Sequence, residues 1–391
     1  MLKPLISIVT TSRAEFGLLS PLIKVLARSN EYVFELYVTG NHLCEFQGNT
    51  IKEIEDEGII ISQTIEIIHH GDSAFAKAKT SANAMSKFSE LFSKRNPDLV
   101  IIMGDRYELL GIASAAALMS IPIAHFSGGE ITEGVIDDAV RHAITKLSQL
   151  HFVSNSVHYD RLLQLGESPS TVHNVGEPGL DNIVNESLLE IEALQSSLDF
   201  KLEKPFCIFT FHPVPNDEGL SPKQQLEVVL SALELLVYKY KIIITSPNSD
   251  EGGESLLPLL TDFQLKNKDS VLFIKSLGFK RYLSALKLCE FVIGNSSSGL
   301  IEAPSFFKPA INIGCRQKGR LRGENIIDVA VNKDAILAGV AQSQLSDFKQ
   351  TLTGSENPYG RGDTVSQVLR ILGNIDWPIN CRKTFFDLGK L

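Results

Sequence analysis

The pattern that most constrains this chain is a repeated alternation of short apolar runs with amphipathic segments. Most of the runs are continuously apolar, as strands buried on both faces of a sheet must be. In residues 136–150, apolar side chains recur at the spacing of a helix face, and segments 18–27, 109–119 and 224–238 are also helix-like. Such alternation predicts parallel α/β sheets. The predicted strands are residues 5–11, 34–39, 99–103, 121–126, 151–153, 207–211, 241–245, 271–274, 291–293 and 310–313.

The length of the chain predicts two domains. At 391 residues it exceeds the size at which a single hydrophobic core usually stops growing. The strand–helix pattern weakens in a polar stretch between residues 177 and 205 and then restarts. We therefore expect Rossmann-like domains over residues 1–180 and 181–362, with a C-terminal helix and tail over 363–391 that returns toward the first domain.

Composition argues against several classes of protein. The net charge is −9 and no Lys/Arg-rich run is present, which argues against nucleic-acid binding. Five cysteines without C-x-x-C spacing argue against a disulfide framework or a structural zinc site. The apolar run 5–9 is too short for a signal peptide or a membrane span, and no segment approaches 18 apolar residues. We expect a cytoplasmic protein with no metal, nucleic-acid or membrane partner.

Polar and small residues follow seven of the predicted strands. In open parallel sheets, ligands bind at the carboxyl ends of the strands. One such stretch, residues 294–299, reads Gly-Asn-Ser-Ser-Ser-Gly before an expected helix. The Ser296 and Ser297 hydroxyls and the free N–H groups there suit a phosphate, although Ser and Asn are also common helix caps without any ligand. Glu302 is placed to hold ribose hydroxyls or, equally, to lie in solvent.

Several cationic residues also follow strand ends. Arg13 and Arg316 come directly after predicted strands, and guanidinium groups match phosphate oxygens through paired hydrogen bonds. His212 follows the strand 207–211 and is a candidate to donate to a diphosphate or to protonate a leaving group. A lone histidine is more often structural. Arg106 and Asn248 lie in similar loops.

Three acids lie on or just beyond two neighbouring strand ends, namely Asp105, Glu130 and Asp137. Together with phosphate binders they suggest general acid/base chemistry at a sugar carbon. Arg141 is four residues after Asp137, so both share one helix face, and an ordinary ion pair is the competing interpretation. Neither G-x-G-x-x-G nor a Walker A motif is present, so dinucleotide oxidoreductases and P-loop NTPases lack their fingerprints.

These motifs together resemble the hydrolysing UDP-N-acetylglucosamine 2-epimerases, most closely the bacterial enzymes of sialic acid biosynthesis. The similarity runs from about residue 5 to 370, with the motifs in order in both halves. Ser127 stands where some relatives carry Glu before the Gly-Gly pair. The matching segments are residues 12–17, 104–108, 128–130, 141–146, 212–213, 294–302 and 312–320.

The resemblance implies a GT-B-like pair of Rossmann-like domains whose parallel sheets face each other across a cleft that holds UDP-N-acetylglucosamine. It implies no cofactor and a homodimer or dimer-based tetramer. Glu302 would hold the ribose, and Leu277 would meet uracil through its backbone. The expected diphosphate and UDP-sugar contacts are Arg13, Arg106, His212, Asn248, Ser296, Ser297 and Arg316. The expected catalytic residues are Asp105, Glu130, Asp137, Arg141 and His212.

The implied reaction expels UDP anti to loss of the carbon-2 proton, which gives 2-acetamidoglucal. Water then adds to release N-acetylmannosamine for sialic acid biosynthesis. A rival is a hydrolysing 2-epimerase for a diacetamido-trideoxy sugar linked to UDP or GDP, which would share these motifs. From other classes, a GT-B glycosyltransferase or an inert nucleotide-sugar sensor remains open, because fold alone decides none of these.

Overall fold

The computed structural model describes residues 3–44, 50–71, 73–132, 136–214, 217, 219–247 and 253–389. The chain divides into two compact units. Unit 1 comprises Met1–Val184 with Tyr359–Leu391, and unit 2 comprises Asn185–Pro358. The expected boundaries after residues 180 and 362 each differ from these by four residues.

A seven-stranded parallel sheet forms the centre of unit 1. Its strand order is β3-β2-β1-β4-β5-β6-β7, so the direction of winding reverses between β1 and β4. Loops after these two strands therefore diverge to opposite faces and leave the edge of the sheet accessible at that point. The strands are β1 (Leu5–Thr10), β2 (Val33–Thr39), β3 (Gln63–Ile65), β4 (Leu99–Met103), β5 (Ile123–Phe126), β6 (Leu150–Val153) and β7 (Val172–Asn174).

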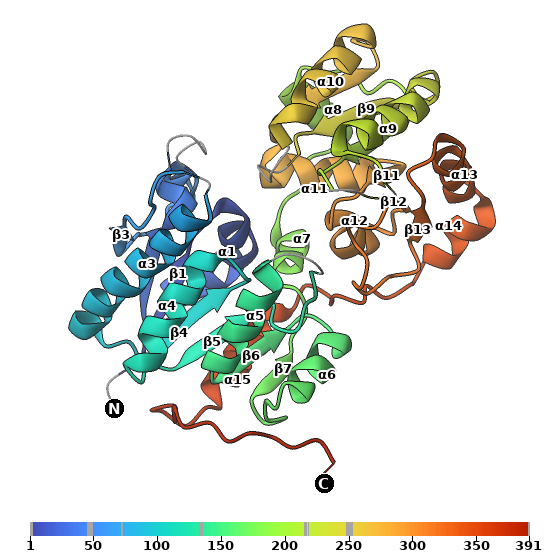
Figure 1. Ribbon diagram of the computed structural model, residues 1–391. Coiled ribbons are helices and arrows are strands. Elements are labelled where there is room, and N and C mark those ends of the chain that lie inside the picture. The colour runs from blue at the N-terminus through green and yellow to red at the C-terminus, as the bar shows by residue number, and fades with distance from the viewer. Residues whose placement is uncertain are drawn as a thin grey trace. The chain divides into compact units, whose positions relative to one another are not determined.

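Helices cover both faces of this sheet (Figure 1). Ile6 and Ile8 of β1 pack in one core with α1 and α15, while Val9 packs in a second core with α3, α4 and α5. Because alternate residues of one strand enter different cores, the strand is buried on both faces and is apolar at most positions, with Ser7 and Thr10 as its polar residues. The helices of this part of the chain are α1 (Arg13–Ala27), α2 (Ile51–Asp56), α3 (Ala74–Arg95), α4 (Tyr107–Leu118), α5 (Ile136–Leu147), α6 (Ser156–Gln164), α7 (Asp181–Asn185) and α15 (Thr364–Gly373), with 3₁₀ turns at Gly40–Leu43 and Pro178–Leu180.

Unit 2 repeats this architecture with a six-stranded parallel sheet. Its order is β10-β9-β8-β11-β12-β13, and the winding reverses between β8 and β11. The elements are α8 (Ile191–Leu198), β8 (Phe206–Thr210), α9 (Pro222–Leu236), β9 (Lys241–Thr245), α10 (Gly253–Lys266), β10 (Val271–Ile274), α11 (Gly278–Leu288), β11 (Phe291–Gly294), α12 (Ser298–Ile301), a 3₁₀ turn (Ala303–Phe306), β12 (Ala310–Ile313), β13 (Ile326–Val329), α13 (Lys333–Ser343) and α14 (Ser346–Leu352).

The parallel α/β class predicted from the sequence is confirmed, and each predicted run overlaps a strand. Three strands were missed, β3, β7 and β13, and all three lie at sheet edges. These three strands are short and contain polar residues such as Gln63, His173 and Asp328, so they lack the continuous apolar run that the other edge strand, β10, retains. The helix predicted over 136–150 instead ends at Leu147, because Leu150 begins β6.

The segment after unit 2 completes unit 1. The Asp181 carboxylate accepts hydrogen bonds from the backbone N–H groups of Thr364 (2.9 Å) and Val365 (3.0 Å) at the start of α15. This satisfies two donors that a helix leaves unpaired. Val368 and Leu372 of α15 are fully buried in the core beneath the sheet.

The tail that follows α15 closes a buried charge cluster in unit 1. Glu167, which is 1% exposed, accepts hydrogen bonds from His151 (2.9 Å), Lys146 (2.6 Å) and Lys383 (2.6 Å). Lys383 also donates to the backbone carbonyls of Thr145, Lys146 and Ser148. Burial raises the pKa of Glu167, but these donors outweigh it and lower the pKa to about 2.

Replacing Lys383 should therefore weaken unit 1. For Lys383→Met we expect a loss of about 1–2 kcal/mol in the free energy of unfolding at pH 7, because a charged hydrogen-bond donor to a buried carboxylate is removed. Urea unfolding followed by the fluorescence of Trp377 measures this, since Trp377 is the sole tryptophan and packs on the unit 1 core.

The pH dependence supplies a second check. A carboxyl with a depressed pKa contributes stability above its unfolded pKa near 4.5 and loses it as the pH falls toward 2. The difference in unfolding free energy between Lys383→Met and the unaltered chain should therefore shrink below pH 4.5, to the extent that it comes from Glu167. The control is Arg382→Met, which changes an exposed neighbour in the same tail. Equal stability of both variants at pH 7 would contradict the role of Lys383.

Candidate functional site

The loop after β1 is organised by a buried carboxylate. Ser12 caps α1, and Glu15 accepts hydrogen bonds from the backbone N–H of Thr11 (2.8 Å) and from its hydroxyl (2.6 Å). Burial raises the pKa of Glu15 to about 7, even though Arg106 and the Thr11 hydrogen bonds act to lower it. Glu15 was not among the predicted site residues, although the Ser-x-x-Glu spacing of a capping box pointed to it.

The two arginines predicted in unit 1 differ in how they are held. Arg106 precedes α4 and contacts Glu108 (2.6 Å) and Glu15 (3.8 Å). Burial lowers the pKa of Arg106, but these carboxylates outweigh it and raise the pKa. Arg13 begins α1, and its Nε atom pairs with Glu53 (2.9 Å), both side chains being more than 40% exposed. Arg106 is thus fixed in place, whereas the surface pair of Arg13 contributes little restraint.

Asp105 and Arg141 meet directly. Asp105 follows β4, and Arg141 on α5 donates to its carboxylate. Arg141 is only 3% exposed and also donates to the Thr132 hydroxyl (3.1 Å), while its Nη1 atom lies 3.6 Å from Asp138. The buried guanidinium therefore orients the Asp105 carboxylate.

A buried histidine supports the same strand end. The Nε2 atom of His125 lies 2.8 Å from the Gly104 carbonyl oxygen, and its Nδ1 atom lies 3.2 Å from the Thr145 hydroxyl. Burial lowers the pKa of His125 to about 3. The ring is therefore neutral at working pH, and it donates to Gly104 immediately before Asp105.

The other two predicted acids, Glu130 and Asp137, lie after the neighbouring strand β5. Glu130 follows a tight turn in which Ser127 (φ 61°) and Gly129 (φ 81°) have left-handed backbone conformations. Asp137 lies in the first turn of α5, and both acids are partly buried. Asp138, which sequence reasoning missed, accepts from the backbone N–H of Thr132 (2.9 Å) and so ties the loop after Glu130 to α5.

In unit 2, one asparagine joins three loops. Asn295 accepts from the backbone N–H of His212 (2.7 Å) and donates back to its carbonyl oxygen (2.9 Å). The Asn295 carbonyl accepts from Gln317 (2.7 Å) and from the predicted site residue Arg316 (3.3 Å). Burial, together with Arg316, lowers the pKa of His212 to about 3. A neutral His212 suits hydrogen-bond donation better than transfer of a proton from an imidazolium.

The serine loop leaves β11 at a position that requires glycine. Gly294 has φ 132°, and a Cβ atom there would overlap the carbonyl oxygen of Thr210. Ser296 and Ser297 are partly buried, and the helix that follows, α12, has only four residues. A phosphate at this loop would rely on hydroxyl and N–H donors more than on a long helix dipole.

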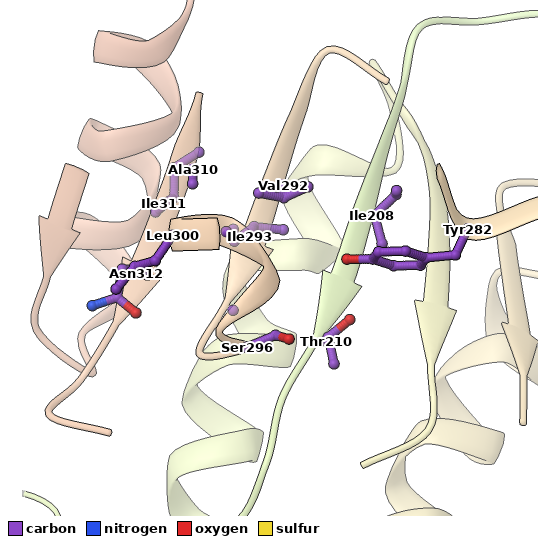
Figure 2. Close-up of a pocket in the computed structure, with 12 residues that line it drawn as sticks. Ile208, Thr210, Tyr282, Val292, Ile293, Ser296, Leu300, Ala310, Ile311 and Asn312 are labelled. Atoms are coloured by element: carbon purple, nitrogen blue, oxygen red, sulfur yellow. The ribbon is translucent and has the colours of Figure 1, made fainter. Parts of the chain in front are cut away.

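A pocket lies beside this loop, between the sheet of unit 2 and α11–α12 (Figure 2). Its polar lining comprises Thr210, Tyr282, Ser296 and Asn312, and its remaining lining is mostly aliphatic. Glu302 follows α12, and its Oε2 atom is buried without a hydrogen-bond partner among the described residues. Burial raises the pKa of Glu302, and a hydrogen bond with Ser298 lowers it.

Two further predicted contacts are Leu277 and Asn248. Leu277 immediately precedes α11, is 3% exposed, and accepts from Arg281 Nε (2.7 Å) through its carbonyl oxygen. Asn248 lies outside the described residues. Among the residues that are described, no group of three His, Cys, Asp or Glu side chains is arranged to hold a metal ion. In the same part of the chain, no helix combines the length and apolar character needed to cross a membrane.

The chain was compared with known proteins. The UDP-N-acetylglucosamine 2-epimerase family model matches residues 24–373. The GDP/UDP-N,N′-diacetylbacillosamine 2-epimerase (hydrolyzing) of Campylobacter jejuni is 38% identical over 389 residues, covering 99% of this chain and 100% of that protein. The UDP-N,N′-diacetylbacillosamine 2-epimerase (hydrolyzing) of Legionella pneumophila is 35% identical, covering 94% of this chain and 95% of its own.

A solved structure shares the fold. The UDP-GlcNAc 2-epimerase from Neisseria meningitidis bound to UDP-GlcNAc superposes with a TM-score of 0.79 at 18% identity, covering 96% of this chain and 100% of that one. The fold is therefore that of GT-B-like epimerases. With the family model spanning most of the sequence and a relative at 38% identity over nearly its full length, the chain belongs to the UDP-N-acetylglucosamine 2-epimerase family.

Proposed function

We propose that this chain is a hydrolysing 2-epimerase that acts on N,N′-diacetylbacillosamine linked to UDP or GDP. The observation that carries the proposal is the 38% identity, over nearly the full length of both chains, to a relative named for this activity. The sequence motifs favoured UDP-N-acetylglucosamine and left the diacetamido sugar as the rival. The relatives reported above favour the rival.

The reaction needs two proton transfers at one carbon. In the first half, the carbon-2 C–H bond and the bond from carbon 1 to the diphosphate oxygen break, and a double bond forms between carbons 1 and 2. In the second half, the oxygen of water bonds to carbon 1 and a proton returns to carbon 2 on the other face. The products are a free 2,4-diacetamido-2,4,6-trideoxymannose and the nucleoside diphosphate.

The acids of unit 1 are suited to the proton transfers. Asp105, Glu130 and Asp137 lie beyond the adjacent strands β4 and β5, and these three carboxyl groups are our candidates for the two faces of carbon 2. Arg141 fixes the direction of the Asp105 carboxylate. Arg106, held by Glu15 and Glu108, is a fixed cation that would favour the departing diphosphate.

The residues of unit 2 are suited to holding the nucleotide. Ser296 and Ser297 offer hydroxyl donors, while His212 and Arg316 are held near one another by Asn295. These neutral donors and the single guanidinium can hydrogen bond to a diphosphate. They leave most of its negative charge in place until the bond to the sugar breaks. Glu302 offers a carboxylate to the ribose hydroxyls.

The substrate can be identified by proton NMR in heavy water. We expect the protein to convert UDP- or GDP-N,N′-diacetylbacillosamine into the free manno-configured sugar with deuterium at carbon 2 and one equivalent of nucleoside diphosphate. Deuterium enters because the returning proton comes from solvent. UDP-GlcNAc in a parallel tube is the matched control. Faster turnover of UDP-GlcNAc than of both diacetamido substrates would overturn the substrate assignment.

The catalytic acids can be tested by isosteric amides. Asp105→Asn and Glu130→Gln should lower kcat by about 10²–10⁴-fold, because an amide cannot accept the carbon-2 proton. The dissociation constant for the nucleoside diphosphate, measured by calorimetry, should change by less than about threefold. The control is Asp160→Asn, which alters an exposed acid on α6 of the same unit. Near-normal turnover in both amide variants would show that other groups move the protons.

A further inference from the structure

Three side chains of unit 2 form a hydrogen-bonded series beside the pocket. The Tyr282 hydroxyl on α11 donates to the Ser298 hydroxyl oxygen at the start of α12, with 2.5 Å between the oxygens. The backbone N–H of Glu302, which follows α12, donates to the Ser298 carbonyl oxygen (3.0 Å), and the Ser298 side chain acts on the Glu302 carboxylate to lower its pKa. Figure 2 shows the Tyr282 hydroxyl directed toward the other residues that line the pocket. The series therefore links α11 to the carboxylate after α12.

The direction of the donors in this series is set by the tyrosine. Burial, together with the nearby Glu302 carboxylate, raises the pKa of Tyr282, so its hydroxyl keeps its proton at neutral pH. The Tyr282 hydroxyl donates its hydrogen bond to the Ser298 oxygen. The Ser298 hydroxyl hydrogen is therefore available to be donated to the Glu302 carboxylate. Each member then orients the next.

Glu302 is left with one oxygen for another donor. Its Oε2 atom is buried and has no hydrogen-bond partner among the residues that the structure describes. Buried polar atoms are normally hydrogen bonded, so an unpartnered buried carboxylate oxygen calls for a donor from a ligand. A sugar hydroxyl is a neutral donor of this kind.

We infer that Tyr282 is a positioning residue for the nucleotide: its hydroxyl acts through Ser298 to orient the Glu302 carboxylate toward the ribose hydroxyls. The inference rests on the proposed function, because it requires that unit 2 holds a nucleotide through Glu302. Tyr282 itself does not touch reacting atoms. Its removal should change how strongly the protein distinguishes a ribose from a sugar without hydroxyls.

The test compares one nucleotide with and without its ribose hydroxyls. Calorimetry gives dissociation constants for UDP and 2′,3′-dideoxy-UDP with the full-length chain and with Tyr282→Phe. We expect the phenylalanine variant to bind UDP about fivefold to tenfold more weakly, the effect of one lost hydrogen bond, and to bind the dideoxy nucleotide as before. The preference for ribose should fall by the same factor. If GDP binds more tightly than UDP, GDP and its dideoxy form serve as the pair.

Two further variants separate positioning from a general loss of packing. Tyr240→Phe removes a hydroxyl from a residue that is 2% exposed in the core of unit 2, and it should leave both constants unchanged. Ser298→Ala should repeat the effect of Tyr282→Phe, and the double variant should be no worse than either single one, because both break the same series.

The outcomes distinguish the two proposals. Unchanged ribose preference in Tyr282→Phe, with tight UDP binding by the unaltered chain, would overturn the role of Tyr282 and leave the proposed function standing. Equal weakening for both nucleotides would also overturn it, since that pattern marks a packing defect. Failure of the unaltered chain to bind UDP or GDP would overturn both. The inference is supported if Tyr282→Phe weakens binding of the ribose nucleotide alone. The double variant should then bind that nucleotide no more weakly than either single variant.

Discussion

The paired hydrogen bonds between the Asn295 side chain and the backbone of His212 join loops 83 residues apart in the chain, and the nucleotide-binding candidates of unit 2 depend on them. The two loops are neighbours because β8 and β11 pair in parallel at the point where the winding of the sheet reverses. Gly294 allows the close approach of the two strand ends. Since the Asn295 carbonyl also accepts from Gln317 and Arg316, one residue arranges three loops without adding a charge.

Unit 1 uses a different kind of contact at its own strand ends. Guanidinium–carboxylate pairs hold Asp105 against Arg141 and hold Arg106 against Glu15 and Glu108. Charged pairs in a partly buried setting fix side-chain directions and keep charges in place during a reaction. In unit 2 the corresponding loops are joined mainly by neutral hydrogen bonds, to which Arg316 adds one guanidinium.

Much of the fold followed from the sequence because central strands carry a readable signal. Strands such as β1 contribute side chains to cores on both faces and so are apolar at most positions. The edge strands β3, β7 and β13 lack that requirement and were missed. Among the site candidates, residues at strand ends could be located from position alone. The hydrogen bonds of Asp138, Asn295 and Tyr282 could not, because each is made with a segment that only the folded chain brings near.

The assembly of unit 1 from two separated stretches bears on the order in which the chain acquires its structure during synthesis. Residues Asn185–Pro358, which form unit 2, leave the ribosome as one uninterrupted stretch and can complete their core without any later residue. Unit 1 is synthesised first, but its core is complete only after Val368 and Leu372 have been added. Its buried charge cluster is complete only after Lys383 can reach Glu167. At usual translation rates this delay is on the order of ten seconds. For that interval α1 can cover its share of this face of the older sheet, but the apolar side chains that α15 later contacts stay exposed to solvent.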